Sequence, residues 1–346
     1  MNYRTADKAS SSQIVVIGAS SGGLDALQTV AGGLSHDFPA PICVVIHTSP
    51  DSPGVIHEIV GRATDMVTVA LRHAQKLEPG KMYFPPPDCH LVVEPGHVRA
   101  TKGPKENRFR PAIDPLFRTA AQVFGPAAIG VILTGNLDDG TAGLAAIKRL
   151  GGRAIVQDPR DALFPAMPQS AMGHVNVDYC VPLAQIAPLL VELTGQLVTA
   201  ATVPIPPELE TEVRIDRQEE SPVAAGLEQI ARPSRFTCPD CHGVLLQIVD
   251  GNRIRFRCHT GHGYSIDSLL ASYSEQIEGS LWNAIRSLEE TALFLDELTR
   301  HARVASTVGD ADDFASRAAD ARKDSAAIRQ IVSDRGALVA ATSDEH

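Results

Sequence analysis

The sequence predicts an α/β fold, in which a doubly wound, mostly parallel sheet of the Rossmann-like three-layer kind is followed by a small zinc ribbon and a C-terminal helical hairpin. Three observations favour this class. Short apolar, β-branched runs alternate with helical patterns up to residue 198. Three of the six cysteines then fall within 21 residues. From residue 266 onward, apolar side chains recur at helical steps of three and four.

Composition narrows the class of protein. The 346 residues suffice for more than one domain, and 44% apolar with 21% charged residues is ordinary for a globular chain. No apolar run is long enough to cross a membrane, so membrane insertion is not expected. Residues 1–13 lack the apolar stretch of a secretory signal, which predicts a cytoplasmic protein. The net charge of −10 argues against nucleic acid as a partner.

The predicted sheet begins with a buried strand at residues 14–17, which ends in the glycine-rich turn 18–23 and leads into a helix. Residues 77–99 differ in character, because proline and glycine recur there at short intervals and predict turns with short antiparallel strands. The remaining strands of the parallel sheet are expected at residues 41–46, 128–133, 154–156 and 179–181.

Four segments follow from these patterns. The sheet domain occupies residues 12–198, and residues 199–232, which are rich in proline and acidic side chains, predict a solvated linker. Residues 233–265 contain the clustered cysteines. Residues 266–340 form a helical tail, in which the apolar stripe of a long helix is expected to pack on a second helix. Formation of a homodimer through this tail is the alternative use of the stripe.

The turn at residues 18–22 matches Gly-x-Ser-x-Gly, placed between a strand and a helix. Glycines let the backbone turn sharply there, so that the Ser20 hydroxyl is exposed at the carboxyl end of the sheet. Free N–H groups at the start of the helix can stabilise an oxyanion. The motif alone also fits a dinucleotide or phosphate loop, although no acidic ribose-binding residue follows the second strand.

A serine nucleophile needs a base and an orienting carboxylate. His47 directly follows the second strand, at the edge where sites of open α/β sheets form. Asp138 and Asp139 follow the third strand at the same edge, and one of them can serve merely as a residue at a helix N-terminus. The chain order Ser, His, Asp excludes the α/β-hydrolase fold, whose triad runs Ser, Asp, His.

Several segments together resemble the catalytic domain of CheB-type chemoreceptor glutamate methylesterases. The similarity covers roughly residues 12–195. The family's segments occur here in order, as Gly-Ala-Ser-Ser-Gly-Gly at 18–23, Ile-His-Thr-Ser-Pro at 46–50, Arg-Pro-Ala-Ile-Asp-Pro-Leu-Phe at 110–117, Leu-Thr-Gly-Asn-Leu-Asp-Asp-Gly at 133–140, Gln-Asp-Pro at 157–159 and Met-Pro at 167–168. The resemblance implies hydrolysis of glutamate γ-methyl esters on methylated chemoreceptors or related helical signalling proteins, in some members with deamidation of glutamine.

The resemblance also implies roles for single residues. Ser20 would be the nucleophile, His47 the base and Asp139, rather than Asp138, the carboxylate, in an acyl transfer that needs no cofactor. Leu137 departs from the family, which has glycine there, and can change the loop that presents the carboxylate. The family's usual N-terminal receiver domain is not expected, since about a dozen residues precede the first strand. Oxyanion and substrate contacts are expected at Ser21, Gly22, Arg110 and Asn136, the last of which replaces a methionine.

The cysteine cluster begins with a C-x₂-C pair, continues through two strand-like runs around a hairpin turn, and ends in a Cys-x₃-His pair. This layout predicts a zinc ribbon with a structural Zn²⁺, and similar modules accompany some family members without a receiver. His242 and His259 compete for the fourth position, and cysteines without a metal are the alternative. Cys238→Ser is expected to unfold residues 235–264 and to spare hydrolysis of a small ester. The expected ligands are Cys238, Cys241, Cys258 and His262.

Arginines make the cysteine module basic within an acidic protein, which favours docking to an acidic receptor helix or partner over nucleic acid. Two functions other than this methylesterase activity stay open, namely a catalytically silent docking scaffold and an esterase for a different substrate. Abolished ester hydrolysis in Ser20→Ala and His47→Ala would distinguish an enzyme from a scaffold. The arginines of the module are Arg232, Arg235, Arg253, Arg255 and Arg257.

Overall fold

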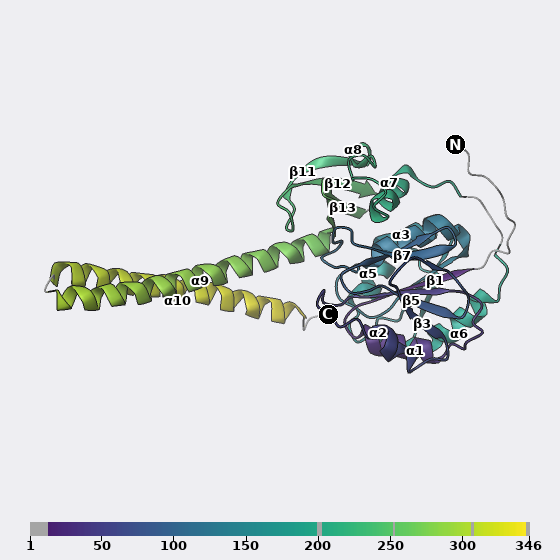
Figure 1. Ribbon diagram of the computed structural model, residues 1–346, viewed down its shortest axis with the longest axis horizontal. Helices are drawn as coiled ribbons and strands as arrows, with labels where there is room; N and C mark the ends of the chain where they lie inside the picture. The colour runs from purple at the N-terminus through teal and green to yellow at the C-terminus, as the bar shows by residue number, and fades with distance from the viewer. Residues whose placement is uncertain (1–12, 199–202, 252, 306–307, 344–346) are drawn as a thin grey trace. The chain divides into compact units, whose positions relative to one another are not determined.

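The computed structural model describes residues 13–198, 203–251, 253–305 and 308–343. It divides into two compact units, Met1–Leu269 and Leu270–His346, each of which is described by itself. The first unit holds every strand found among the described residues (Figure 1).

A seven-stranded, wholly parallel sheet forms the centre of the first unit, which confirms the prediction of an α/β fold built on a large parallel sheet. Its order is β10-β9-β8-β1-β2-β5-β3, so β2 and β8 flank β1 on opposite sides. The carboxyl ends of these three strands meet where the strand order reverses, which is where open α/β sheets bind ligands. The strands are β1 (Ile14–Ala19), β2 (Ile42–Ile46), β3 (Val67–Ala70), β5 (Lys81–Phe84), β8 (Ala128–Ile132), β9 (Arg153–Gln157) and β10 (Tyr179–Val181).

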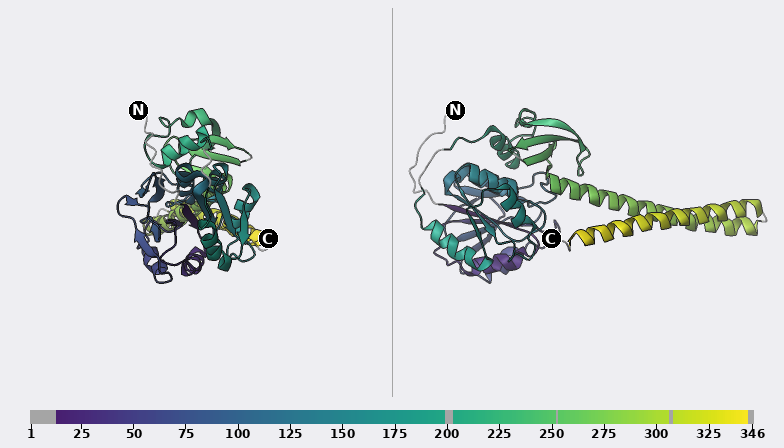
Figure 2. Two further views of the ribbon diagram at one scale, coloured as in Figure 1. Left: turned by 90° about the vertical axis from the view of Figure 1, so that its right-hand side faces the viewer. Right: turned by 180° about the vertical axis from the view of Figure 1, so that it is seen from behind.

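Helices cover both faces of this sheet, because alternate strand residues point to opposite sides. Val16 and Val45 belong to the core under α3, α4 and α5, whereas Val15 and Val44 belong to the core under α1, α2 and α6. Figures 1 and 2 show α3 on one side of the strands and α1 and α2 on the other. The helices are α1 (Gly23–Gly32), α2 (Ile56–Gly61), α3 (Ile113–Phe124), the 3₁₀ turn η1 (Gly125–Ala127), α4 (Thr141–Arg149), α5 (Ala166–His174) and α6 (Leu183–Thr194).

A smaller antiparallel sheet precedes α3, with the order β4-β7-β6. It accounts for the short antiparallel strands predicted within residues 77–99, except that β5 of the same segment joins the parallel sheet between β2 and β3. The sequence missed this, because a four-residue strand bounded by glycine and proline looks the same in either sheet. The strands of the smaller sheet are β4 (Gln75–Lys76), β6 (His90–Glu94) and β7 (His97–Thr101).

The segment predicted as a solvated linker, residues 199–232, is largely structured. Its first part, 199–202, lies outside the described residues. Leu209 and Val213 of the following helix are buried in the core that contains α3. The linker prediction rested on proline and acidic composition, and it was wrong because Glu212 and Asp216 are buried against arginines far away in the chain. The helices are α7 (Pro207–Asp216) and α8 (Leu227–Ile230).

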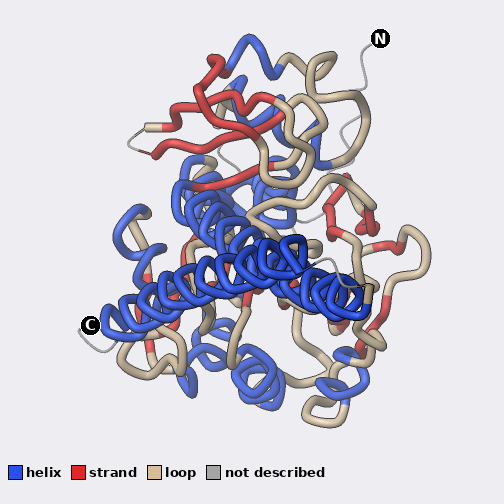
Figure 3. The backbone as a smooth tube through the Cα atoms, turned by 90° about the vertical axis from the view of Figure 1, so that its left-hand side faces the viewer, coloured by secondary structure: helices blue, strands red, loops and turns tan. Residues whose placement is uncertain are grey.

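The cysteine-containing segment forms a four-stranded antiparallel sheet with the order β11-β12-β13-β14, drawn in red at the top of Figure 3. The turn around Gly251 joins β12 to β13, and Asp250 is paired with Arg253 across it. Leu246 and Ile248 of β12 are buried on α7 and α8 residues, so this sheet has a small core of its own. The strands are β11 (Ala231–Thr237), β12 (Val244–Asp250), β13 (Arg253–Cys258) and β14 (Gly263–Ser265).

The second unit consists of α10 (Val308–Ser343) and most of α9 (Ile266–Val304). Ala292 and Leu295 of α9 are buried, as is Ala318 of α10. Glu289 of α9 accepts hydrogen bonds from Arg329 and Ser325 of α10, at 2.6 and 3.2 Å, which links the two helices. No helix among the described residues is long and apolar enough to span a membrane.

Candidate active site

The ends of three neighbouring strands bring Ser20, His47 and Asp139 into one line of hydrogen bonds. The Ser20 hydroxyl oxygen lies 3.0 Å from Nδ1 of His47. The opposite ring nitrogen, Nε2, lies 2.7 Å from Oδ2 of Asp139. Three separate parts of the chain thus meet in a hydrogen-bonded Ser-His-Asp line of the kind by which serine hydrolases activate a nucleophile.

Ser20 occupies a turn that only small residues permit. Gly22 has a φ of 70° at the start of α1, and the Gly23 amide donates to the Ser20 carbonyl at 2.8 Å. Gly135, on the loop after β8, faces the serine closely, since a Cβ there would stand 2.7 Å from Cβ of Ser20. The two loops must therefore lack bulk for the hydroxyl to reach the cavity.

The His47 ring is held by packing as well as by hydrogen bonds. Phe109 stacks on it, with ring centroids 3.7 Å apart and planes 10° from parallel. The histidine side chain is only 4% exposed. The contact of Phe109 with His47 was not predicted from the sequence, because a phenylalanine between two arginines does not indicate which ring it stacks on.

Asp139 is buried and surrounded by donors. Its Oδ2 accepts from His47 and from the Ile113 amide at 2.7 Å, and its Oδ1 accepts from Asn107 and the amides of Gly140 and Asp114 at 2.8, 3.0 and 3.3 Å. Two of these amides lie in the first turn of α3, whose dipole favours a negative charge. The environment thus stabilises a carboxylate that accepts from the histidine.

The neighbouring Asp138 contacts a serine hydroxyl instead of the histidine, which agrees with the expectation that Asp139 is the carboxylate of the site. Its Oδ1 accepts one hydrogen bond from the Ser265 hydroxyl at 2.7 Å. Burial raises the pKa of Asp138 to about 6. It makes no contact with His47 among the hydrogen bonds of the described residues.

A cavity of about 670 Å³ opens over Ser20 and His47, and it is large enough for a glutamate ester side chain. Ser21, Asn136, Leu137 and Arg110 line it too. The side-chain amide nitrogen of Asn136 donates to the Ser21 hydroxyl oxygen at 3.0 Å. The Ser20 amide is engaged with the Thr134 carbonyl at 3.0 Å, so oxyanion donors must come from other groups.

Arg110, a predicted substrate contact, and Leu137, which replaces the family's glycine, are under constraints that the sequence did not indicate. Arg110 donates to Asp88 at 2.8 Å and to the Gly103 carbonyl at 2.6 Å, so its charge is already paired. Leu137 has a φ of 60°, the left-handed conformation suited to glycine. The loop therefore keeps a glycine-like backbone around a leucine side chain.

The expected metal ligands converge. Ligand atoms of Cys238, Cys241, Cys258 and His262 all lie within 4.8 Å of one another. Sγ of Cys258 is 3.6 Å from Sγ of Cys241 and 3.5 Å from Nδ1 of His262. A tetrahedral zinc with thiolates at about 2.3 Å has edges of about 3.8 Å, so the donor set fits such an ion. The group includes neither His242 nor His259.

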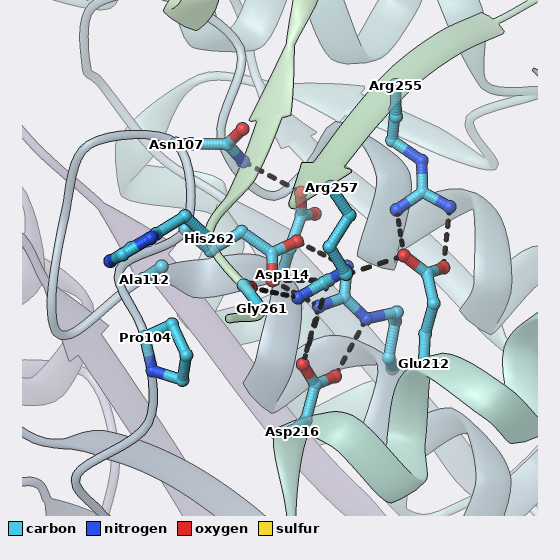
Figure 4. Close-up of polar contacts among 12 residues, drawn as sticks. Pro104, Asn107, Ala112, Asp114, Glu212, Asp216, Arg255, Arg257, Gly261 and His262 are labelled. Atoms are coloured by element: carbon cyan, nitrogen blue, oxygen red, sulfur yellow. Dashed lines mark hydrogen bonds and ion pairs between the residues drawn. The ribbon is translucent and has the colours of Figure 1, made fainter. Parts of the chain in front are cut away.

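The predicted basic docking patch is wrong for its central arginines, which are buried in a charge cluster (Figure 4). Arg255 forms two hydrogen bonds of 2.6 Å with Glu212. Arg257 donates to Glu106 at 2.8 Å, and Arg118 joins the same carboxylate at 2.7 Å. The cluster connects β13 of the cysteine-containing sheet to α3 and α7. Sequence alone cannot reveal it, because the partners come from elements far apart in the chain.

Comparison with known proteins decides the family. The family model described as CheB methylesterase matches residues 15–190, which include Ser20, His47 and Asp139. The chain belongs to the CheB methylesterase family. A Leptospira interrogans protein that carries a provisional name as a protein-glutamate methylesterase/protein-glutamine glutaminase is 37% identical, over 52% of this chain and 94% of its own length.

Other members of the CheB family agree over the same region. Protein-glutamate methylesterase FrzG of Myxococcus xanthus is 34% identical, over 52% of this chain and 54% of its own length. The crystal structure of the Thermotoga maritima CheB methylesterase catalytic domain matches with a TM-score of 0.51 and 34% identity, covering 53% of this chain and 99% of that one. The cysteine-containing sheet and the two long helices lie beyond the residues matched by the family model.

Proposed function

We propose that this protein is a protein-glutamate methylesterase, which hydrolyses glutamate γ-methyl esters on chemoreceptor-like signalling proteins. The names of its relatives support this activity, and some of them also name a glutaminase activity. The observation that carries the proposal is the hydrogen-bonded line of Ser20, His47 and Asp139 beside a cavity. Deamidation of glutamine would use the same acyl transfer, with ammonia in place of methanol as the leaving group.

The geometry assigns a direction to the proton transfer. Asp139 can only accept, so the hydrogen of the neutral His47 ring lies on Nε2 and is donated to Oδ2. Nδ1 is then free to accept the Ser20 proton as the serine oxygen attacks the ester carbonyl. The protonated ring next donates this proton to the methoxide oxygen, and methanol leaves. Water repeats the sequence on the acyl-enzyme and releases the glutamate carboxylate together with free Ser20.

The oxyanion of the tetrahedral intermediate needs donors at the cavity wall. We assign this role to the backbone amides around Ser21 and Asn136, which line the cavity next to Ser20. The Asn136 side chain can add a donor by releasing the Ser21 hydroxyl. Gly22 supports the turn, and Arg110 supports the rim of the cavity through Asp88.

Methanol release from a methylated chemoreceptor fragment tests the proposal. Wild-type protein is expected to release methanol, and Ser20→Ala to lose the activity by several orders of magnitude. Ser280→Ala is the matched control, because this exposed serine of α9 donates to the Gln276 carbonyl of its own helix. A folded wild-type protein that releases no methanol would favour another ester or a docking scaffold instead.

We also propose a structural Zn²⁺ held by Cys238, Cys241, Cys258 and His262. Three thiolates and an imidazole fill a tetrahedral site and leave no open position for a substrate. The ion would contribute to the folding of the zinc ribbon, whose own apolar core is small. In the second unit we propose a helical hairpin, supported by the pairing of Glu289 with Arg329. Homodimerisation through this hairpin stays a prediction, which sedimentation equilibrium tests.

A further inference from the structure

We infer that Asn107 is a positioning residue for Asp139, and that the segment Gly263–Ser268, which follows the cysteine cluster, holds Asn107 in place. The catalytic site would then be completed by residues outside the region shared with the CheB family. The inference rests on the proposed function, and it concerns this same site.

The Asn107 side chain links Asp139 to the segment Gly263–Ser268, within the first unit. Its amide nitrogen donates to Oδ1 of Asp139 at 2.8 Å and to Oδ2 of Asp114 at 2.9 Å. Its amide oxygen accepts from the Ser265 backbone amide at 2.9 Å and from the Ser268 hydroxyl at 3.1 Å. Since a backbone amide can only donate, the oxygen must face Ser265, and the nitrogen must face the carboxylates. The orientation of the side chain is thereby fixed.

The backbone of Asn107 is tied to the same segment. The backbone N–H of Asn107 donates to the Gly263 carbonyl at 2.8 Å, and the backbone N–H of Gly263 donates to the Lys105 carbonyl at 3.1 Å. Asn107 and Arg108 both have positive φ angles, of 49° and 77°. A conformation of this kind persists only where its surroundings determine it, and here the surroundings include the segment after His262.

The turn that carries the last metal ligand also packs on this loop. Gly261 has a φ of 101°, and a Cβ on it would stand 2.9 Å from Pro104. Figure 4 shows the Arg257 side chain near the Gly261 carbonyl, to which it donates at 2.8 Å. His90 ties the two ends of the loop together, since its ring contacts the Pro104 carbonyl at 2.9 Å and the Ala112 amide at 3.1 Å. The cysteine turn is therefore in place to fix the Pro104 end of the loop.

The same loop reaches both partners of the nucleophile. Asn107 contacts Asp139, and two residues later Phe109 stacks on the His47 ring. Displacement of the loop would therefore loosen the carboxylate and the base together. This departs from the expectation that Cys238→Ser spares hydrolysis of a small ester: an unfolded module would remove the support of Asn107.

The test compares Asn107→Ala and Ser268→Ala with the exposed helical control Asn283→Ala, using methanol release and the rate of Ser20 inactivation by phenylmethylsulfonyl fluoride. We expect kcat to fall roughly 10- to 100-fold in Asn107→Ala, and less in Ser268→Ala, because a small misplacement of the carboxylate suffices for such losses. KM should stay within about twofold, since neither residue lines the cavity. Sulfonylation, which needs no receptor, should slow in parallel.

Ser268→Ala removes a single hydroxyl, so it keeps the test informative if Asn107→Ala does not fold. Full kcat and full sulfonylation in either folded variant would overturn the inference. A rise in KM with an unchanged kcat and an unchanged rate of sulfonylation would overturn the inference too, since the segment would then act on substrate docking. Failure of the proposed function looks different, because wild-type protein would then release no methanol from the receptor fragment, whereas failure of the inference leaves the wild-type release intact.

Discussion

Asp139→Asn replaces the one side chain of the site that only accepts hydrogen bonds. Every neighbour of the carboxylate is a donor: the His47 ring and the Ile113 amide at Oδ2, and Asn107 with two backbone amides at Oδ1. An asparagine must turn its NH₂ group toward one of these two sets. Either choice sets donor against donor, or forces the histidine into the tautomer that cannot accept the serine proton.

The size of the effect follows from these contacts. Wrong tautomers in other Ser-His-Asp enzymes cost about 10⁴-fold in kcat, so a fall of roughly 10³- to 10⁴-fold is expected here. The buried site also loses charge-assisted hydrogen bonds and leaves a donor unpaired, which should lower the free energy of unfolding by about 2–4 kcal/mol. KM should change little, because Asp139 does not line the cavity.

Asp138→Asn is the matched control, because the two aspartates are adjacent and only one contacts the histidine. Its single partner, the Ser265 hydroxyl, can donate to an amide oxygen as it does to the acid. Burial raises the pKa of Asp138 to about 6. The folded protein therefore loses stability as the pH rises from about 3.8, the pKa of an aspartate in the unfolded chain, to about 6. Asparagine does not ionise, so Asp138→Asn removes this loss. We expect kcat within a few fold of wild type and equal or higher stability at pH 7. Equal kcat losses in both variants, measured by methanol release beside urea unfolding, would refute the reasoning.

Three further predictions follow from single contacts. Leu137→Gly should raise the unfolding free energy by about 0.5–1 kcal/mol, since glycine tolerates a φ of 60°; urea unfolding that shows a loss would contradict this. Arg255 lowers the pKa of buried Glu212 to about 2 despite its desolvation, so stability present above pH 4.5 should be lost as pH falls toward 2. Glu212→Gln should cost about 3–5 kcal/mol at pH 7 and lose part of that acid dependence, and unchanged unfolding curves at pH 7 and 3 would count against the buried pair. Cys258→Ser should lower the zinc content by mass spectrometry from about one ion per chain to near none, whereas His259→Ala should leave it intact.

The parallel strands and the three residues of the site could be predicted from the sequence, because their signals are local. A buried parallel strand is a continuous apolar run, and polar residues directly after it must lie at the carboxyl edge. This reasoning placed Ser20, His47 and the Asp138–Asp139 pair at one edge, and the family resemblance favoured Asp139. The structure then brought Ser20, His47 and Asp139 within hydrogen-bonding distance.

The parts that failed depend on pairing between distant segments. Arg255 and Arg257 alternate with apolar residues, as in an exposed strand face, and Glu212 lies in an acidic, proline-rich segment. Each therefore looked solvated, and only their mutual burial reveals a charge cluster. The role of Asn107 could not be predicted either, since the four hydrogen-bonding partners of its side chain lie up to 161 residues away. Such contacts are set by topology, and no local pattern in one sequence encodes them.

The most direct test of the central claim is to find the covalent intermediate. Wild-type protein mixed with a glutamate-methylated receptor peptide, quenched in acid within milliseconds and digested, should yield a fragment containing residues 14–30 that carries the peptide as an ester on Ser20. His47→Ala should give none on the same time scale, because the serine proton then has no acceptor. Methanol release without any adduct on Ser20, or with the adduct on another residue, would contradict the account.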